Sequence, residues 1–287
     1  MTVHVVRTPE ELGDLGKGTS GLVPTMGALH AGHFTLIARA AAENDTAVVS
    51  IFVNPSQFGN ANDLARYPRN LESDIATAAA AGAGIIYAPD AATVYPPGFS
   101  TWVEPGSLAE QWEGKSRPGH FRGVATVVSI LLNSVLPHRS YFGEKDFQQL
   151  QVIRRMHRDL RLPGTIVASP TVRDMDGLAL SSRNARLSSQ GRVTARSIPM
   201  ALAAIADASR RGVTAAADLE SAGRRVLAQP GLELDYLAIV DAATLEQVEI
   251  ASGPRRVLLA AVVDGVRLID NIALPATNGE IAGHAAA

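Results

Sequence analysis

The first residues in this chain whose types and spacing suggest chemistry are His30 and His33, with a glycine, Gly32, between them. The apolar residues 21–23 before this motif resemble the end of a buried strand, and the apolar spacing over 34–43 predicts a helix. The start of a helix offers unpaired N–H groups and the positive end of the helix dipole, which together attract phosphate. The motif therefore indicates a phosphate site with two imidazoles as additional donors, at which Gly32 admits a ligand close to the backbone.

A pair of surface histidines is the alternative interpretation, because a His-x-Gly-His sequence occurs by chance in many proteins. The position of the pair favours function. It lies where a strand ends, the chain turns on Gly27 and a helix begins, and a motif gains weight in such a context.

Polar side chains also follow two further strand-like segments. Asn54 and Gln57 come after the β-branched run 46–52, and Lys145 comes after the short run 140–142. Ligands of open parallel sheets bind beyond the carboxyl ends of the strands, so these side chains are expected on the same rim as the histidines. The alternative is that Asn54 is a turn residue, Gln57 a surface amide and Lys145 a solvated lysine.

A polar loop at residues 113–123 contains Arg117 and His120 and precedes an expected apolar helix at 124–133. A long loop that carries these residue types and is tethered to a buried helix is typical of a substrate-binding loop rather than of a linker.

A second phosphate site is indicated where Ser181 and Ser182 stand beside Arg183. Two hydroxyl groups and a guanidinium are donors suited to phosphate oxygens. The alternative is a serine-rich turn that caps the next helix, although Ser188 and Ser189 already supply such a cap.

The elements that must position these residues alternate between strands and helices, which predicts an α/β fold with a Rossmann-type parallel sheet in the N-terminal domain. Strands are expected at 3–6, 22–24, 46–52, 85–89, 140–142 and 165–168, with an edge strand at 101–104. Helices are expected at 9–15, 33–43, 71–81, 124–133 and 147–160. The helix at 33–43 should pack through one apolar face, formed by Phe34, Ile37, Ala38 and Ala41.

The character of the chain changes from about Ser189, where a smaller α+β C-terminal domain is expected. Its helices are predicted at 193–211 and 215–229, and its strands at 234–240, 257–263 and 266–269. An Asp264-Gly265 turn joins the last two strands as a hairpin. We place the domain boundary between 171 and 172, which gives domains of residues 1–171 and 172–287, and expect a disordered tail from about 279.

The composition narrows the class of protein. Of the 287 residues, 46% are hydrophobic and 19% are charged, which is typical of a soluble globular protein. The formal net charge of −2 gives no basic surplus for nucleic acid or a membrane surface as the main partner. The absence of cysteine excludes disulfides and cysteine-based sites. We find neither a signal peptide nor a membrane span, and expect a cytoplasmic protein.

Five motifs, taken in order, resemble the pantothenate synthetase (pantoate–β-alanine ligase) family of the class I aminoacyl-tRNA-synthetase-like nucleotidylyltransferases. They are Pro-Thr-Met-Gly-Ala-Leu-His-Ala-Gly-His at 24–33, Phe-Val-Asn-Pro-Ser-Gln-Phe at 52–58, Pro-Gly-His-Phe-Arg-Gly-Val at 118–124, Phe-Gly-Glu-Lys-Asp-Phe-Gln-Gln at 142–149 and Ser-Ser-Arg-Asn at 181–184. The resemblance covers roughly residues 20–275. Five motifs in register are far more specific than a His-x-Gly-His motif alone.

The resemblance implies a reaction in two steps. ATP and pantoate form pantoyl adenylate and pyrophosphate, and the amine of β-alanine then attacks the activated carbonyl to give pantothenate and AMP. It also implies Mg²⁺ as a cofactor, small molecules as the only substrates, and a homodimer formed through the N-terminal domain. The N-terminal domain would bind ATP and pantoate, with the C-terminal domain as a lid over the nucleotide.

The resemblance also assigns roles to individual residues. Those that would share the charge on the phosphates are His30, His33, Lys145, Ser181, Ser182 and Arg183. Further ATP contacts would be Met26, Gly27, Gly143, Asp146, Val172 and Leu180. Pantoate would be held by Thr25, Met26, Gln57 and Gln149, and the β-alanine side would be formed by Asn54, Arg117 and His120. Asp74, with Ser73 beside it, resembles the carboxylate near the Mg²⁺–pyrophosphate site.

Two residues depart from the family pattern. Ala31 stands where a glutamate is often found between the histidines, and Leu180 replaces a methionine that commonly precedes Ser-Ser-Arg-Asn. Neither change removes a proposed catalytic side chain, although Leu180 would alter the adenine pocket.

Two other functions compete with the ligase. A nucleotidylyltransferase with a phosphorylated acceptor would need more basic residues than the Gln57 and Gln149 pair provides. A nucleotide-binding protein without activity would not need the full set of histidine, lysine, serine and arginine donors.

Overall fold

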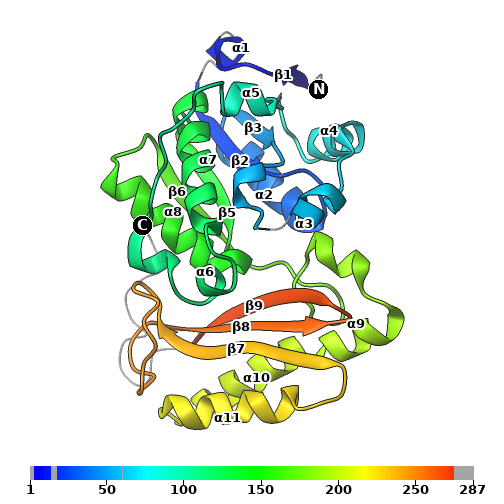
Figure 1. Ribbon diagram of the computed structural model, residues 1–287, viewed down its shortest axis with the longest axis vertical. Helices are drawn as coiled ribbons and strands as arrows, with labels where there is room; N and C mark the ends of the chain where they lie inside the picture. Colours follow the sequence, from blue (N-terminus) through cyan, green and yellow to red (C-terminus); the bar gives the residue numbers. More distant parts are fainter. Residues whose placement is uncertain (1–2, 14–17, 60, 275–287) are drawn as a thin grey trace. The chain divides into compact units, whose positions relative to one another are not determined.

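The computed structural model describes residues 3–13, 18–59 and 61–274 (Figure 1). Contacts between residues divide the chain into two compact units, of which the first ends at Val172 and the second begins at Arg173. No helix of the described residues is long and apolar enough to cross a membrane.

The N-terminal unit is built on a six-stranded sheet in which every neighbouring pair of strands is parallel. The order across the sheet is β1 (His4–Val6), β4 (Ile85–Tyr87), β3 (Thr46–Ile51), β2 (Ser20–Thr25), β5 (Arg139–Gly143) and β6 (Thr165–Ser169). The chain runs outward from β2 through β3 to β4 and later returns to the other side of β2 with β5. The strand order therefore reverses at β2, and ligands of such sheets bind at this reversal, beyond the carboxyl ends of the strands.

Helices cover both faces of this sheet, which confirms the predicted α/β class. On one face, α2 (Ala31–Glu43) and α4 (Leu71–Ala80) bury Ile37, Ala40 and Ala78 against apolar strand residues that include Val23 and Val49. The main helices of the other face are α7 (His120–Val135) and α8 (Phe147–Asp159), which pack against each other and against β2 and β5. Shorter helical segments are α1 (Pro9–Gly13), η1 (Pro55–Gln57), α3 (Ala61–Arg66), α5 (Ala91–Val94), η2 (Gly106–Ala109), α6 (Glu113–Ser116) and η3 (Glu144–Asp146).

Three expectations for this unit were wrong. Phe34 does not join the buried face of α2 and is 41% exposed, since the first turn of this helix stands at the rim of the sheet. Residues 101–104 form no strand, because this segment binds side chains of α7 instead: the Val103 N–H donates to Thr126 Oγ1 at 3.0 Å. Helix α7 begins at His120, one turn before the expected start at 124, so His120 is a helical residue rather than a loop residue.

The C-terminal unit has a three-stranded antiparallel sheet of β7 (Leu232–Asp241), β8 (Arg255–Val263) and β9 (Val266–Leu274). Asp264 and Gly265 join β8 to β9 with φ angles of 53° and 69°, which confirms the expected tight hairpin turn. The helical segments of this unit are η4 (Ser182–Arg186), α9 (Ser189–Ala195), α10 (Ser197–Arg210) and α11 (Ala216–Leu227).

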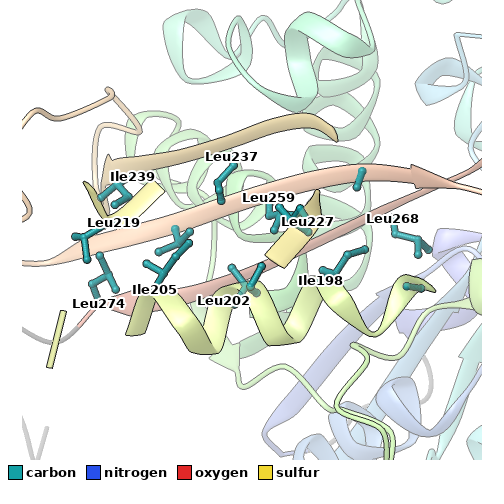
Figure 2. Close-up of a cluster of buried hydrophobic side chains, with 14 of the residues drawn as sticks. Ile198, Leu202, Ile205, Leu219, Leu227, Leu237, Ile239, Leu259, Leu268 and Leu274 are labelled. Atoms are coloured by element: carbon teal, nitrogen blue, oxygen red, sulfur yellow. The ribbon is translucent and has the colours of Figure 1, made fainter. Parts of the chain in front are cut away.

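The core of the C-terminal unit lies between helices α10 and α11 and the antiparallel sheet (Figure 2). Ile198, Leu202 and Ile205 of α10 meet Leu237, Leu259 and other strand residues there. The single helix expected over 193–211 is instead split into α9 and α10. Pro199 explains the break, because it has no N–H to donate to Ala195 and its ring crowds that carbonyl. The tail expected from about 279 lies outside the described residues.

Candidate active site

The two histidines cap the first turn of α2 reciprocally. The Gly32 N–H donates to His30 Nδ1 at 3.1 Å, and the His30 N–H donates to His33 Nδ1 at 3.3 Å. A backbone N–H can only donate, so both Nδ1 atoms must be unprotonated acceptors. Each neutral ring therefore carries its proton on Nε2. The two rings, with centroids 4.1 Å apart, are thereby held as a pair of Nε2–H donors at a helix N-terminus.

The surroundings keep both rings neutral. Burial, followed by the neighbouring His30 ring, lowers the pKa of His33 to about 3, with Lys145 adding to the shift and Asp146 opposing it. Burial and the charge of Lys145 also lower the pKa of His30. Lys145, which follows β5, is thus close enough to influence both histidines that follow β2, in agreement with its expected position on the same rim. The pair offers hydrogen bonds to a phosphate without carrying positive charge.

The turn before His30 is held in an unusual backbone conformation by a distant carboxylate. Gly27 and Ala28 have φ angles of 77° and 50°, in the left-handed region that favours glycine. Asp74, in the first turn of α4, accepts the Ala28 N–H at 3.1 Å and the Leu29 N–H at 2.8 Å. A Cβ at Gly27 would lie 2.6 Å from Asp74 Oδ2, so this close approach requires glycine.

Thr25, expected on the pantoate side, uses its hydroxyl to join neighbouring strand ends. Its Oγ1 donates to the Ser50 carbonyl at 2.7 Å and accepts the Gly27 N–H at 3.2 Å. The side chain is buried, whereas Met26 next to it is half-buried. The Thr25 hydroxyl therefore helps to shape the turn that leads to His30.

Asn54 lies three residues beyond the end of β3 and is almost fully enclosed, with 1% of its surface exposed. Its Nδ2 group donates to Gln57 Oε1 at 2.9 Å and to the Gly123 carbonyl at 3.2 Å. Its Oδ1 accepts from the N–H and hydroxyl of Ser56 and from the hydroxyl of Tyr95. Both N–H groups of the Asn54 amide thus donate to protein atoms. The main effect of Asn54 on the site is therefore to hold the Gln57 side chain.

His120, in the first turn of α7, and Arg117, directly after α6, both meet the backbone carbonyl of Gln57. His120 Nδ1 lies 3.0 Å from the Gln57 carbonyl, which can only accept, so this nitrogen carries the proton. The Nε2 atom then faces Arg117 Nη1 at 3.2 Å with its lone pair. Burial and the neighbouring Arg117 charge lower the pKa of His120 to about 4, so the ring is neutral near pH 7.

The segment after β5 presents Lys145 and Gln149. Lys145 is largely buried and lies 3.7 Å from Asp146 Oδ1. No other described residue hydrogen-bonds the half-buried Gln149 side chain, whereas the buried Gln148 amide bonds the Glu113 N–H and the carbonyls of Leu108 and Gln111. The two adjacent glutamines therefore differ in task, with Gln148 supporting the fold and Gln149 available to a ligand. A Cβ at Gly143 would meet no protein atom within 4 Å, so packing does not explain this glycine.

The Ser-Ser-Arg-Asn motif forms η4 in the C-terminal unit. The Ser181 hydroxyl accepts the Arg183 N–H at 3.2 Å, and Asn184 Nδ2 donates to the Ala179 carbonyl at 3.0 Å. Leu180 and the side chains of Ser182 and Arg183 are partly exposed. Val172 is the last residue of the N-terminal unit.

The residues described contain no group of three or more histidine, aspartate or glutamate side chains that could cage a metal ion. Asp74 stands near the His30 turn, and each of its oxygens accepts one backbone N–H. Mg²⁺ commonly binds through one or two carboxylates together with substrate phosphates and water, so a single carboxylate fits such an ion.

Two residues of this region escaped prediction from the sequence. A Cβ at Gly123 would come within 2.5 Å of the Ser56 carbonyl oxygen, so this glycine lets α7 reach the Asn54–Gln57 turn. Tyr95 joins the same turn through Asn54 and follows β4 and α5. Since the carboxyl end of β4 belongs to the same rim, the strand-end rule that selected Asn54 was the available signal for Tyr95.

Comparisons with known proteins agree on one family. Residues 3–273 match the model of the family described as pantoate-beta-alanine ligase. The pantothenate synthetase of Rhizorhabdus wittichii is 54% identical over 254 residues, which cover 88% of this chain and 90% of that protein. The pantothenate synthetase of Rubrobacter xylanophilus is 50% identical, with 94% of this chain and 98% of that protein covered.

Solved structures give the same result. A crystal structure of pantothenate synthetase from Thermus thermophilus has a TM-score of 0.89 and 46% identity, and covers 94% of this chain and 99% of that chain. A pantoate-beta-alanine ligase from Francisella tularensis, complexed with beta-gamma ATP and beta-alanine, has a TM-score of 0.77 and 35% identity, with 94% and 97% covered.

Proposed function

The chain belongs to the pantoate–β-alanine ligase family, and on that premise we propose how its residues carry out the reaction. The protein is an ATP-dependent ligase that condenses pantoate with β-alanine to give pantothenate, AMP and pyrophosphate. The observation that carries the mechanism is the fixed tautomer of His30 and His33, which makes both rings neutral Nε2–H donors at the N-terminus of α2.

In the first step, a carboxylate oxygen of pantoate attacks the α-phosphorus of ATP, and the bond from that phosphorus to the oxygen bridging the β-phosphate breaks. Negative charge grows on the α-phosphate and on the departing pyrophosphate. His30, His33 and Lys145 stabilise it by donation from positions that the fold has already set. Met26, Gly27, Gly143 and Asp146 complete the nucleotide site of the N-terminal unit.

In the second step, the amine of β-alanine attacks the acyl carbon of pantoyl adenylate, AMP leaves, and the nitrogen loses a proton. Arg117 and His120 form the side of the site that receives β-alanine. The Arg117 guanidinium suits the β-alanine carboxylate, and the neutral His120 ring adds no second positive charge next to the amine. Asn54 contributes through its bond to Gln57.

Pantoate is proposed to lie between Gln57 and Gln149, with Thr25 and Met26 next to it. Both glutamines follow strands whose carboxyl ends lie on the same rim, β3 and β5. The Gln149 amide has no hydrogen-bond partner within the described residues, and Gln57 uses only the oxygen of its amide there. Neutral amides suit the hydroxyl groups and single carboxylate of pantoate, whereas a phosphorylated acceptor would need more basic residues.

Mg²⁺ is part of the proposal as the ion that accompanies ATP. When bound, it would neutralise charge on the phosphates, and Asp74 is the carboxylate that would hold it through the lone pairs left after the Ala28 and Leu29 bonds.

The C-terminal domain, residues 172–287, is proposed to act as a lid that brings Ser181, Ser182 and Arg183 to the phosphates, with Val172 and Leu180 against the adenine. The domain of residues 1–171 would hold the rest of the site. A crystal structure with ATP bound tests this: the three side chains should lie within hydrogen-bond reach of phosphate oxygens. We also propose a cytoplasmic homodimer from the family resemblance, which light scattering of the purified protein tests.

Release of AMP from ATP is the test of the reaction itself. The purified protein should form AMP and pantothenate in equal amounts, and only when both pantoate and β-alanine are present. AMP formation that needs neither acid nor amine would contradict the ligase. Transfer of the nucleotide to a phosphorylated acceptor, without pantothenate, would identify the competing nucleotidylyltransferase.

A further inference from the structure

The amide of Asn54 has only one allowed orientation, and two backbone groups decide it. The Gly123 carbonyl, 3.2 Å from Nδ2, can only accept a hydrogen bond. The Ser56 N–H, 3.3 Å from Oδ1, can only donate. A rotated amide would place its N–H₂ group against the Ser56 N–H, which is donor against donor. It would also place its oxygen against the Gly123 carbonyl, which is acceptor against acceptor. Asn54 must therefore direct an N–H toward Gln57.

The orientation of Gln57 follows from that of Asn54. Because Nδ2 of Asn54 donates at 2.9 Å, the Gln57 atom that faces it must be the carbonyl oxygen Oε1. The Nε2–H₂ group then points away from Asn54, and no described residue accepts from it. Gln57 is only 7% exposed, yet its Nε2 is not among the fully buried atoms of the described residues that lack a partner, so this N–H₂ group is the part of the side chain that is open to a ligand.

Tyr95 holds the other end of this chain of hydrogen bonds. Its hydroxyl donates to Asn54 Oδ1 at 2.7 Å and lies 3.0 Å from the Ser56 hydroxyl. The ring is packed among aromatic neighbours, with centroids 5.0 Å from Phe99, 6.0 Å from Trp102 and 6.2 Å from Phe52. Burial raises the pKa of Tyr95, so the hydroxyl keeps its proton and stays a donor. Tyr95 is thus a fixed donor that favours the amide orientation set by the backbone.

We propose that Tyr95 positions Gln57 through Asn54, and that this Tyr95–Asn54–Gln57 relay makes Gln57 a donor that selects an oxygen acceptor on pantoate. The identity of the ligand rests on the proposed function, whereas the relay rests on the contacts above. An acceptor here is a carboxylate oxygen or a hydroxyl lone pair. Tyr95 acts through Asn54 and is a positioning residue rather than a catalytic one.

The Tyr95→Phe variant tests the relay, because it removes one oxygen and leaves the aromatic cluster in place. Loss of one neutral hydrogen bond should raise the KM for pantoate in pyrophosphate exchange by about threefold to tenfold, with the KM for ATP unchanged. Tyr87→Phe is the matched control, since Tyr87 is also buried in this unit and its hydroxyl bonds Ser134 near the end of α7. The control should leave both KM values unchanged.

A double-mutant cycle separates positioning from a general structural effect. If Tyr95 acts through Gln57, Tyr95→Phe should change the pantoate KM by less than about twofold once Gln57→Ala is present. The same fold increase in both backgrounds would overturn the relay. Far-ultraviolet circular dichroism and the melting temperature establish that each variant is folded.

The Gln57→Glu variant tests the donor polarity. A carboxylate has nearly the same shape as the amide and only accepts, so it should raise the pantoate KM more than Gln57→Ala does. Equal pantoate binding by Gln57→Glu and the unchanged protein would overturn the donor assignment. A wild-type protein that forms no pantothenate would instead contradict the proposed function. An active wild-type protein with an unaffected Tyr95→Phe variant would contradict the relay alone.

Discussion

Asp74 accepts the backbone N–H of Leu29 at 2.8 Å, across 45 residues of sequence. Its second oxygen accepts the N–H of Ala28, whose φ of 50° places it in the left-handed region. Helix α4 therefore holds the turn that delivers His30 to the start of α2. The same carboxylate is the proposed ligand of Mg²⁺. Holding the turn and binding the metal predict different results for a variant of Asp74.

Asp74→Asn should weaken the turn, because the amide keeps one acceptor oxygen and turns an N–H₂ group toward the other backbone N–H. We expect the loss of a hydrogen bond to a charged group to lower the free energy of unfolding by about 1.5–3 kcal/mol. Pyrophosphate exchange should slow about tenfold or more at every Mg²⁺ concentration. Chemical denaturation and an Mg²⁺ titration of the exchange rate measure both effects.

The exposed neighbour Glu72 provides a control in the same turn of α4, and Glu72→Gln should change neither quantity. If excess Mg²⁺ restored the exchange rate of Asp74→Asn and its unfolding were unchanged, the carboxylate would serve the metal and not the turn.

His33→Ala and Lys145→Ala should each slow the first half-reaction. Labelled pyrophosphate should exchange into ATP with pantoate alone, and removal of one preorganised donor typically costs about 10²–10³ in rate. His4→Ala, which changes an exposed histidine on β1, is the control.

His120→Ala should impair pantothenate formation more than exchange. Exchange that strictly required β-alanine would contradict an adenylate intermediate that forms before β-alanine binds. Exchange that survived both His33→Ala and Lys145→Ala would mean that the phosphates bind elsewhere.

Gln149→Ala and Gln148→Ala should have opposite profiles although the residues are adjacent. Gln149 has no protein partner among the described residues, so its loss should raise the KM for pantoate by about tenfold and leave the melting temperature unchanged. Gln148 satisfies three backbone groups, so its loss should lower the melting temperature by several degrees. Steady-state kinetics and differential scanning calorimetry would show the contrast, and an unchanged pantoate KM for Gln149→Ala would refute its assignment.

The buried His120 should make the protein sensitive to acid. Its pKa is lowered to about 4 in the folded state and is near the ordinary value in the unfolded state, so only the unfolded state gains the proton between pH 6.5 and 4. The contribution of this group to the free energy of unfolding is complete above pH 6.5. It decreases as the pH drops and is about 2 kcal/mol smaller at pH 5.

His120→Asn removes the titration and keeps an N–H donor for the Gln57 carbonyl. Urea unfolding at pH 8 and pH 5 should therefore show a smaller acid loss for this variant than for the unchanged protein. Equal losses would mean that His120 is already protonated in the folded state at pH 5.

Apart from the edge strand expected at 101–104, the sequence predicted the strands well, because those signals are local. The β-branched run that became β3 and the Asp264–Gly265 turn each carry their signal within a few residues. The start of α2 is also local, since its caps are supplied by His30 and His33 themselves.

Contacts between distant segments were not predictable in the same way. The Asp74 bond to the His30 turn and the Tyr95 bond to Asn54 join residues about 40 positions apart, and nothing in the local spacing signals them. The exposure of Phe34 depends on where the sheet ends and not on the helical pattern of α2. The break between α9 and α10 did have a local signal in Pro199, which the apolar spacing outweighed.

The reversal of strand order at β2 also has a consequence for the protein during its synthesis. A nascent chain that has emerged as far as β4 holds His30, His33 and Gln57, but the side of β2 that later pairs with β5 is still an open edge. At about 5–20 residues per second, the ribosome needs roughly 4–18 seconds to translate from the end of β3 to the start of β5. Lys145 arrives with the strand that closes this edge, so the part of the proposed nucleotide site that belongs to the N-terminal unit is completed together with the protection of β2 from pairing with other chains.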